Sequence, residues 1–108
     1  MDYEEAKIRT NIIKAIANPI RLMIVDELGK GEKCLCELMP KFKLDQSTLS
    51  RHISQLKKVG IVSERKEGVR IILSLATPCI MSIFECVRDV AKNDLEKRNK
   101  VLNKGTKE

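Results

Sequence analysis

Apolar side chains recur at helical spacing along the first part of the chain. Residues 4–17 repeat alanine and isoleucine in this way and stop at Asn18-Pro19. Asparagine is a favoured N-cap and proline a favoured first helical residue, so a second helix is expected to begin there and to end at Gly29. The pattern therefore predicts two helices, over 4–17 and 19–29.

Two shorter helices are predicted next. The third covers roughly 33–39 and ends near Pro40, because proline lacks an N–H donor and disfavours helix in the residue before it. The fourth, over 46–58, has Asp45 as its N-cap and Gly60 after its end. Its apolar residues line one stripe of the helix: Leu49, Ile53 and Leu56. The opposite face of this helix is polar and basic and carries no acid.

A β-hairpin and a last helix complete the pattern. Residues 61–64 and 69–75 are rich in valine and isoleucine, and the segment between them, 65–68, ends in a glycine that suits a turn. Thr77-Pro78 then caps a long helix. Two short helices joined by a tight turn and followed by a hairpin predict a winged helix-turn-helix, a mainly α fold with a small β-hairpin.

The length of 108 residues suits one compact domain. We expect this domain to span residues 1–102, and we expect 103–108 to be a disordered tail. No apolar run approaches the roughly 18 to 20 residues that a membrane helix needs, and the acidic first residues do not form a signal peptide. These features predict a cytoplasmic protein with no membrane partner.

Basic charge is concentrated in the middle of the chain. The net charge is +6, and residues 41–70 carry eight Lys or Arg against three Asp or Glu. A local basic block favours a polyanion as partner, whereas a merely solvated surface would scatter the charge. Only three aromatic residues are present, too few for the stacking platforms that bind single strands. Double-stranded DNA is the predicted partner.

The polar face of the fourth helix and the hairpin supply the candidate DNA-binding residues. Helix residues can reach base edges in the major groove, and cations near the hairpin suit phosphates. For the helix the candidates are Gln46, Ser47, Thr48, Ser50 and Arg51. For phosphates they are Lys41, Lys43, Lys57, Arg65, Lys66 and Arg70, with the last three hairpin residues expected near its tip. Plain solvation of an exposed face is the alternative for the serines.

His52 lies at the border of the buried stripe. Rotation by about 100° per residue along the helix places it about 60° from Leu49. We expect a residue that packs or forms a hydrogen bond at the edge of the core. Contact with DNA and metal ligation remain the alternatives.

Cys34 and Cys36 form a C-x-C pair at the predicted start of the third helix. Lys33 and the positive end of the helix dipole favour thiolates, so we expect a ligand-binding or redox role. Two small buried hydrophobic residues are the alternative. In an ideal helix, residues two apart point about 200° from each other. Ligand binding is therefore expected to distort this turn and to displace the helix over 46–58.

Cys79 and Cys86 lie seven residues apart at the start of the last helix. They share a stripe, but their separation of about 10 Å along the helix is too large for a bridge between them. Three interpretations remain open. They pack in an interface, they complete the Cys34 and Cys36 site as ligands or disulfide partners, or they form a separate site.

Four stretches of the chain resemble the ArsR/SmtB family of dimeric metalloregulatory repressors: Ala15 to Leu28, Glu32 to Leu38, Asp45 to Leu56 and Gly60 to Leu75. The similarity covers about residues 8–90. The box EKCLCEL carries the C-x-C-[DE]-L pattern of the thiolate branch of that family, whose members sense arsenite, antimonite, cadmium or lead. The resemblance implies a homodimer paired mainly through its first and last helices and a palindromic operator. It also implies DNA release when Cys34 and Cys36 bind a ligand.

Departures from the family pattern reduce the number of candidate inducers. Arsenite-sensing members often have a third cysteine where this chain has Met39, and the N-terminal cysteines of the cadmium and lead branch are missing. The Asp and His set of the zinc branch is also missing, because His52 is the only histidine. We therefore expect arsenite or antimonite as inducer, with another soft metal as a weaker option and no organic cofactor. Release through cysteine oxidation or a persulfide-derived bridge is the alternative.

Catalysis is not expected. The chain has no Ser/His/Asp set, paired-carboxylate pocket or glycine-rich phosphate loop, and its C-x-C pair lacks the βαβ context of redox enzymes. A small thiol oxidoreductase, or a module that uses the winged helix to bind protein, is the rival from another functional class.

Overall fold

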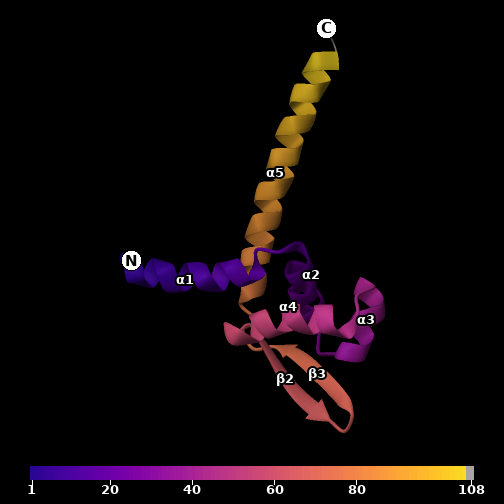
Figure 1. Ribbon diagram of the computed structural model, residues 1–108. Coiled ribbons are helices and arrows are strands. Elements are labelled where there is room, and N and C mark those ends of the chain that lie inside the picture. The colour runs from indigo at the N-terminus through magenta and orange to yellow at the C-terminus, as the bar shows by residue number, and fades with distance from the viewer. Residues whose placement is uncertain (107–108) are drawn as a thin grey trace. The chain divides into compact units, whose positions relative to one another are not determined.

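The structure, a computed structural model, describes residues 1–106, with side chains placed over 1–99. The chain forms two compact units, one over residues 1–78 and one from residue 79 on. The first unit contains α1 (Tyr3–Ile16), α2 (Pro19–Gly29), β1 (Lys33–Cys34), α3 (Leu35–Phe42), α4 (Gln46–Lys58), β2 (Val62–Glu67) and β3 (Arg70–Leu75) (Figure 1). The second unit is α5 (Ile80–Thr106).

The caps expected for α2 and α4 are present. The Asn18 side chain accepts hydrogen bonds from the backbone N–H groups of Ile20 and Arg21, at 2.9 and 3.2 Å. Asp45 accepts one from the N–H of Thr48 at 3.0 Å. These bonds satisfy donors that the first turn of a helix leaves free, which is why both helices begin where the sequence predicts.

The core of the first unit lies where α2, α4 and the sheet meet. The apolar stripe predicted on α4 is confirmed, because Leu49, Ile53 and Leu56 are all buried. Against them lie residues with no more than 3% of their surface exposed: Ile24, Val25, Leu28, Leu38, Ile61 and Leu73. Burying a side chain of this size stabilises the fold by about 1.5–3 kcal/mol. This packing fixes α4 and leaves its polar face outward.

The third helix differs from the prediction at both ends. Cys34 is not helical but extended, with φ −70° and ψ 143°, and it is the N-cap of α3. Its strand β1, which the sequence pattern did not indicate, pairs with β3. At the other end α3 continues through Pro40 to Phe42. The loss of one N–H donor is outweighed by the packing of Leu35 and Leu38, which are buried on one side of the helix.

The sheet has the order β1-β3-β2, with antiparallel neighbours. The hairpin of β2 and β3 lies beside α4 (Figure 1). The strand β2 extends to Glu67, beyond the predicted end at residue 64, whereas β3 lies within the predicted 69–75. Glu67 pairs with Arg70 across a two-residue turn. Gly68 begins that turn with φ 62°, a conformation that costs other residues energy. The prediction of a turn over 65–68 was therefore wrong, and Arg65 lies within the ladder instead of at the tip.

The second unit is the single helix α5. It continues to Thr106, beyond the expected domain end at residue 102, and part of the tail expected over 103–108, residues 107–108, lies outside the described residues. Several apolar residues of α5 are exposed: Ile83, Val87, Val90 and Leu95. Within the described part of the chain, no helix has the length and apolar character required to cross a bilayer.

Candidate DNA interface and thiol site

The first turns of α4 present most of the predicted base-reading residues. Gln46, Ser47 and Arg51 are exposed, and Thr48 is half-buried. The Ser47 hydroxyl donates to the Asp45 carboxylate at 3.3 Å. Hydrogen bonds from Thr48 hold the pKa of Asp45 below its usual value, which keeps this cap ionised. The exposed start of α4 is thus a polar surface with Arg51 as its cation.

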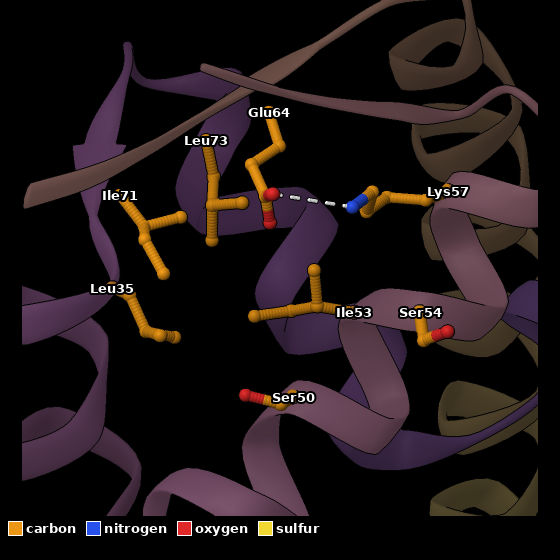
Figure 2. Close-up of a pocket in the computed structure, with 8 residues that line it drawn as sticks. All are labelled: Leu35, Ser50, Ile53, Ser54, Lys57, Glu64, Ile71 and Leu73. Carbon is orange, nitrogen blue, oxygen red and sulfur yellow. Dashed lines mark ion pairs between the residues drawn. The ribbon is translucent and has the colours of Figure 1, made fainter. Parts of the chain in front are cut away.

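Ser50 and Lys57 lie on a different side of α4, facing the hairpin. Together with residues of α3, β2 and β3 they line a cavity of about 180 Å³: Leu35, Ser50, Ile53, Ser54, Lys57, Glu64, Ile71 and Leu73 (Figure 2). The Lys57 ammonium lies 3.3 Å from the Glu64 carboxylate of β2. Both predicted DNA contacts therefore lie at the junction of α4 and the hairpin.

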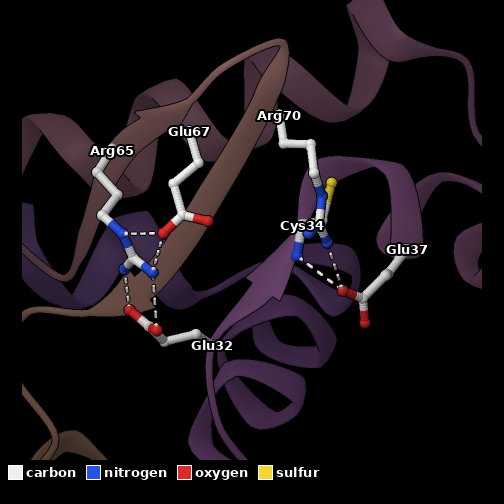
Figure 3. Close-up of polar contacts among 6 residues, drawn as sticks. All are labelled: Glu32, Cys34, Glu37, Arg65, Glu67 and Arg70. Carbon is white, nitrogen blue, oxygen red and sulfur yellow. Dashed lines mark hydrogen bonds and ion pairs between the residues drawn. The ribbon is translucent and has the colours of Figure 1, made fainter.

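Arg65 of the hairpin is bound by two carboxylates. Its guanidinium donates to both oxygens of Glu32, in the loop before β1, with the Nη2–Oε1 contact at 3.1 Å. It also donates to Glu67 at 3.0 and 3.2 Å (Figure 3). The hydrogen bonds that Arg65 donates to Glu32, and next those to Glu67, raise the pKa of Arg65, and the bond to Glu32 lowers the pKa of Glu32.

Among the other residues predicted to contact phosphates, some form ion pairs with carboxylates and some do not. Arg70 lies 3.7 Å from the Glu37 carboxylate of α3. Lys41 forms a 2.7 Å pair with the buried Glu27 of α2, and this contact holds the pKa of that carboxyl below its usual value. Within the described part of the chain no such pair involves Lys43, Arg51 or Lys66.

His52 is half-buried and forms a hydrogen bond, as the sequence predicts for a residue at the core edge. Its Nδ1 atom accepts a hydrogen bond from Arg21 Nε at 3.2 Å, which joins α4 to α2. Burial lowers the pKa of His52, and the nearby charges of Arg21 and Arg51 lower it further. An acceptor Nδ1 belongs to the neutral imidazole.

Cys34 and Cys36 lie at the junction of β1 and α3, where the structure joins their sulfurs in a disulfide with 5.1 Å between the Cα atoms. Cys34 is only 2% exposed, whereas Cys36 is exposed. The Cys36 N–H also donates to Cys34 Sγ at 3.1 Å. The two sulfurs converge because Cys34 is extended, so the expectation that they point about 200° apart was wrong. The two sulfurs are therefore close enough to share one ligand without the unwinding of a helical turn.

The structure does not place a further metal ligand with Cys34 and Cys36 among the described residues. No group of three or more His, Cys, Asp or Glu side chains suited to a metal occurs among the described residues. Met39, in the place of a third cysteine, is half-buried. Cys79 and Cys86 are exposed free thiols of the second unit. The first unit thus offers two cysteine sulfurs as ligands, those of Cys34 and Cys36.

Sequence reasoning missed the carboxylates beside the thiols. Glu37 accepts a hydrogen bond from the Cys34 N–H at 3.2 Å and completes a capping box with Cys34 as the cap. The spacing of a cap and a glutamate three residues later signals this motif, but cysteine replaces the usual serine or threonine. No sequence signal pairs Glu32 with Arg65, which lie 33 positions apart.

Comparisons with known proteins agree with this architecture. Residues 18–64 match the family described as bacterial regulatory protein, arsR family. The nodulation protein NolR of Rhizobium meliloti is 34% identical over 94 residues, which are 87% of this chain and 77% of NolR. The arsenical resistance operon repressor of Staphylococcus xylosus is 40% identical over 68 residues, which are 63% of this chain and 62% of that protein. Among solved structures, the homodimeric winged helix-turn-helix DNA-binding domain of Mb0332 from Mycobacterium bovis has a TM-score of 0.75 at 29% identity, with 90% of this chain and 93% of that chain covered.

Proposed function

Because this chain belongs to the arsR family of bacterial regulatory proteins, we propose that it is a homodimeric repressor whose operator is released when arsenite or antimonite binds Cys34 and Cys36. The family and the fold make it a DNA-binding transcription regulator with a winged helix-turn-helix, not an enzyme. The observation that carries the proposed trigger is the convergence of two sulfurs at the start of α3. We place this regulator in the cytoplasm, where a reducing pool keeps such pairs as thiols.

The DNA contact proposed here uses the exposed start of α4 and cations that have no carboxylate partner among the described side chains. Gln46, Ser47 and Arg51 suit base edges in the major groove, and Lys43 and Lys66 suit phosphates. The residues predicted from the sequence also included Lys57, Arg65 and Arg70. These three cations already pair with carboxylates in the structure, so we give them less weight as phosphate contacts.

The homodimer is supported by exposed apolar residues on each unit. On α1 they are Tyr3, Ile8, Ile12 and Ile13, and on α5 they are Ile83, Val87, Val90 and Leu95. Ile8 and Ile12 share a face of α1, and Ile83, Val87 and Val90 share a face of α5. Exposed apolar residues on one helix face mark an interaction surface. The M. bovis domain is homodimeric by its description. A twofold dimer presents two equivalent recognition helices, so we propose a palindromic operator.

The ligand step replaces oxygen by sulfur on the arsenic. The disulfide is first reduced by a cellular dithiol, which gives two thiols and leaves the reductant as its own disulfide. Arsenous acid then condenses with the two thiols to give a dithiolate that keeps one hydroxyl, and two water molecules leave. Soft thiolates suit this thiophilic ligand better than the oxygen ligands elsewhere in the first unit.

A fluorescence anisotropy titration tests the proposed function. Reduced protein should bind a labelled palindromic operator and lose affinity when arsenite is added, while ultraviolet absorption reports sulfur-to-arsenic bonds. The variant Cys34→Ser/Cys36→Ser should bind the operator as well as wild type and ignore arsenite. Unchanged wild-type affinity at saturating arsenite would refute the arsenite trigger.

Oxidative release is the second candidate function, and the disulfide between Cys34 and Cys36 favours it. A peroxide would oxidise the two thiols to the disulfide and be reduced to water. Oxidised wild-type protein should then bind the operator more weakly than reduced protein, and mass spectrometry should show the loss of two hydrogens. Equal affinities of the two forms would exclude this mechanism.

A further inference from the structure

Two ion pairs join the segment Glu32–Leu38, here called the thiol box, to the hairpin (Figure 3). Glu32 binds Arg65 of β2 through both carboxylate oxygens. Glu37 lies 3.7 Å from Arg70 of β3. Both arginines were expected to contact phosphates, so the box occupies cations that DNA would otherwise attract.

Glu37 connects the cysteine pair with the hairpin directly. The same carboxylate oxygen, Oε1, accepts the hydrogen bond from the Cys34 backbone at 3.2 Å and faces the Arg70 guanidinium. A shift of the Cys34 backbone therefore changes the position of the carboxylate that holds Arg70. Because Cys34 carries one of the two sulfurs, this shift is the expected first result of a change in their bonding.

The hairpin is also tied to α4. Neighbouring residues on a strand point to opposite faces, so Glu64 and Arg65 of β2 hold different partners. Glu64 pairs with Lys57 of α4 at 3.3 Å, while Arg65 pairs with Glu32. The strand β2 is thus held by α4, the recognition helix, through Glu64 and by the thiol box through Arg65.

On the basis of the proposed function, we propose that Glu32 and Glu37 are positioning residues that transmit the state of the Cys34 and Cys36 pair to the hairpin. Ligand binding moves the thiol box, loosens the grip on Arg65 and Arg70, and changes the orientation of the hairpin on DNA. The signal reaches DNA through the sheet as well as through α4. In this arrangement the two arginines orient the hairpin, and their own contact with phosphate is secondary.

The two ion pairs act by positioning the hairpin, not by stabilising the fold. Each pair is exposed, and exposed ion pairs contribute little to the free energy of unfolding. Replacement of the carboxylates by amides should therefore leave the fold intact. Glu37→Gln is suited to the test, because glutamine can keep the hydrogen bond from Cys34 while losing the charge that holds Arg70.

The experiment measures operator affinity by anisotropy with and without arsenite for four reduced proteins. These are wild type, Glu32→Gln/Glu37→Gln, Glu67→Gln and Cys34→Ser/Cys36→Ser. Glu67→Gln is the matched control, because it removes a carboxylate partner of Arg65 that belongs to the hairpin itself. Arsenite binding is followed separately by its ultraviolet band.

Wild type and Glu67→Gln should lose affinity by at least about tenfold on arsenite binding, a usual size for coupling between sites. The double glutamine variant should show the same ultraviolet band but a loss of about threefold or less. An equal loss in wild type and in the double glutamine variant would overturn this inference and leave the proposed function standing. If wild type itself shows no loss, the arsenite trigger fails and the inference built on it fails too.

Discussion

Cys34 and Arg65 lie on one cross-strand row of the sheet, with Ile72 of β3 between them. Residues paired across antiparallel strands point to the same face, so the buried cysteine and the hairpin arginine share a side of the sheet. The cysteine pair is therefore part of the same sheet as the hairpin, and not only the start of a helix next to the recognition helix.

The salt dependence of operator binding should distinguish the hairpin cations. Each phosphate contact contributes a slope of about −0.9 to log K against log salt concentration. Lys66→Ala should make the slope less negative by about this amount. Arg65→Ala should change it less, because Glu32 and Glu67 already neutralise Arg65. A full loss of about 0.9 in Arg65→Ala would show that this arginine contacts phosphate directly.

Stability should depend on pH through His52. Its pKa in the folded chain lies below the ordinary value of 6.5, mainly because of burial. Protonation therefore costs more in the folded chain than in the unfolded chain, and the stabilisation present above pH 6.5 is lost as the pH falls through the folded pKa. Urea unfolding followed by circular dichroism at a series of pH values should show this decline.

The control for this prediction is His52→Gln, which keeps an acceptor for Arg21 but does not titrate. The decline just below pH 6.5 should disappear in this variant. The carboxyl of Glu27, whose pKa is held below 4.5, titrates at lower pH and does not overlap. An unchanged decline in His52→Gln would assign it to another group.

The N-cap of α2 should contribute measurably to the free energy of unfolding. Asn18→Ala removes the acceptor for two backbone donors and should lower the free energy of unfolding by about 1 kcal/mol. Asn18→Asp retains an acceptor and should stay close to wild type. Urea midpoints compare the three proteins, and equal midpoints for wild type and Asn18→Ala would contradict the assigned cap.

The two cysteines of the thiol box should differ in reactivity. Cys36 is exposed and Cys34 is buried in the structure, so after reduction iodoacetamide should modify Cys36 first. Peptide mass spectrometry after short exposure gives the order, and both sites should react alike in urea. Faster modification of Cys34 in the folded protein would contradict its burial.

The proposed homodimer should depend on the exposed apolar residues of α1. Ile13, which is 57% exposed in the single chain, becomes charged in Ile13→Glu, and this variant should be a folded monomer by light scattering. Lys14→Glu places a carboxylate on an already polar position and should remain a dimer. If Ile13→Glu is also a dimer, the interface lies elsewhere.

The sequence alone determined the positions of α1, α2 and α4, the caps of α2 and α4, and the core stripe of α4. Asn18 and Asp45 set their helix starts through bonds to residues two or three positions away, and Leu49, Ile53 and Leu56 follow a local period. The same local signals, with the C-x-C box, were sufficient to indicate a winged helix-turn-helix regulator with a thiol site.

Tertiary structure decided the geometry of that site. The strand β1 forms by pairing with β3, which lies some 40 positions later in the chain. This pairing makes Cys34 extended and brings its sulfur to Cys36. The contact of Glu32 with Arg65 joins residues 33 positions apart. Strand pairing and ion pairs across such distances depend on how the chain packs, and no local period or cap records them.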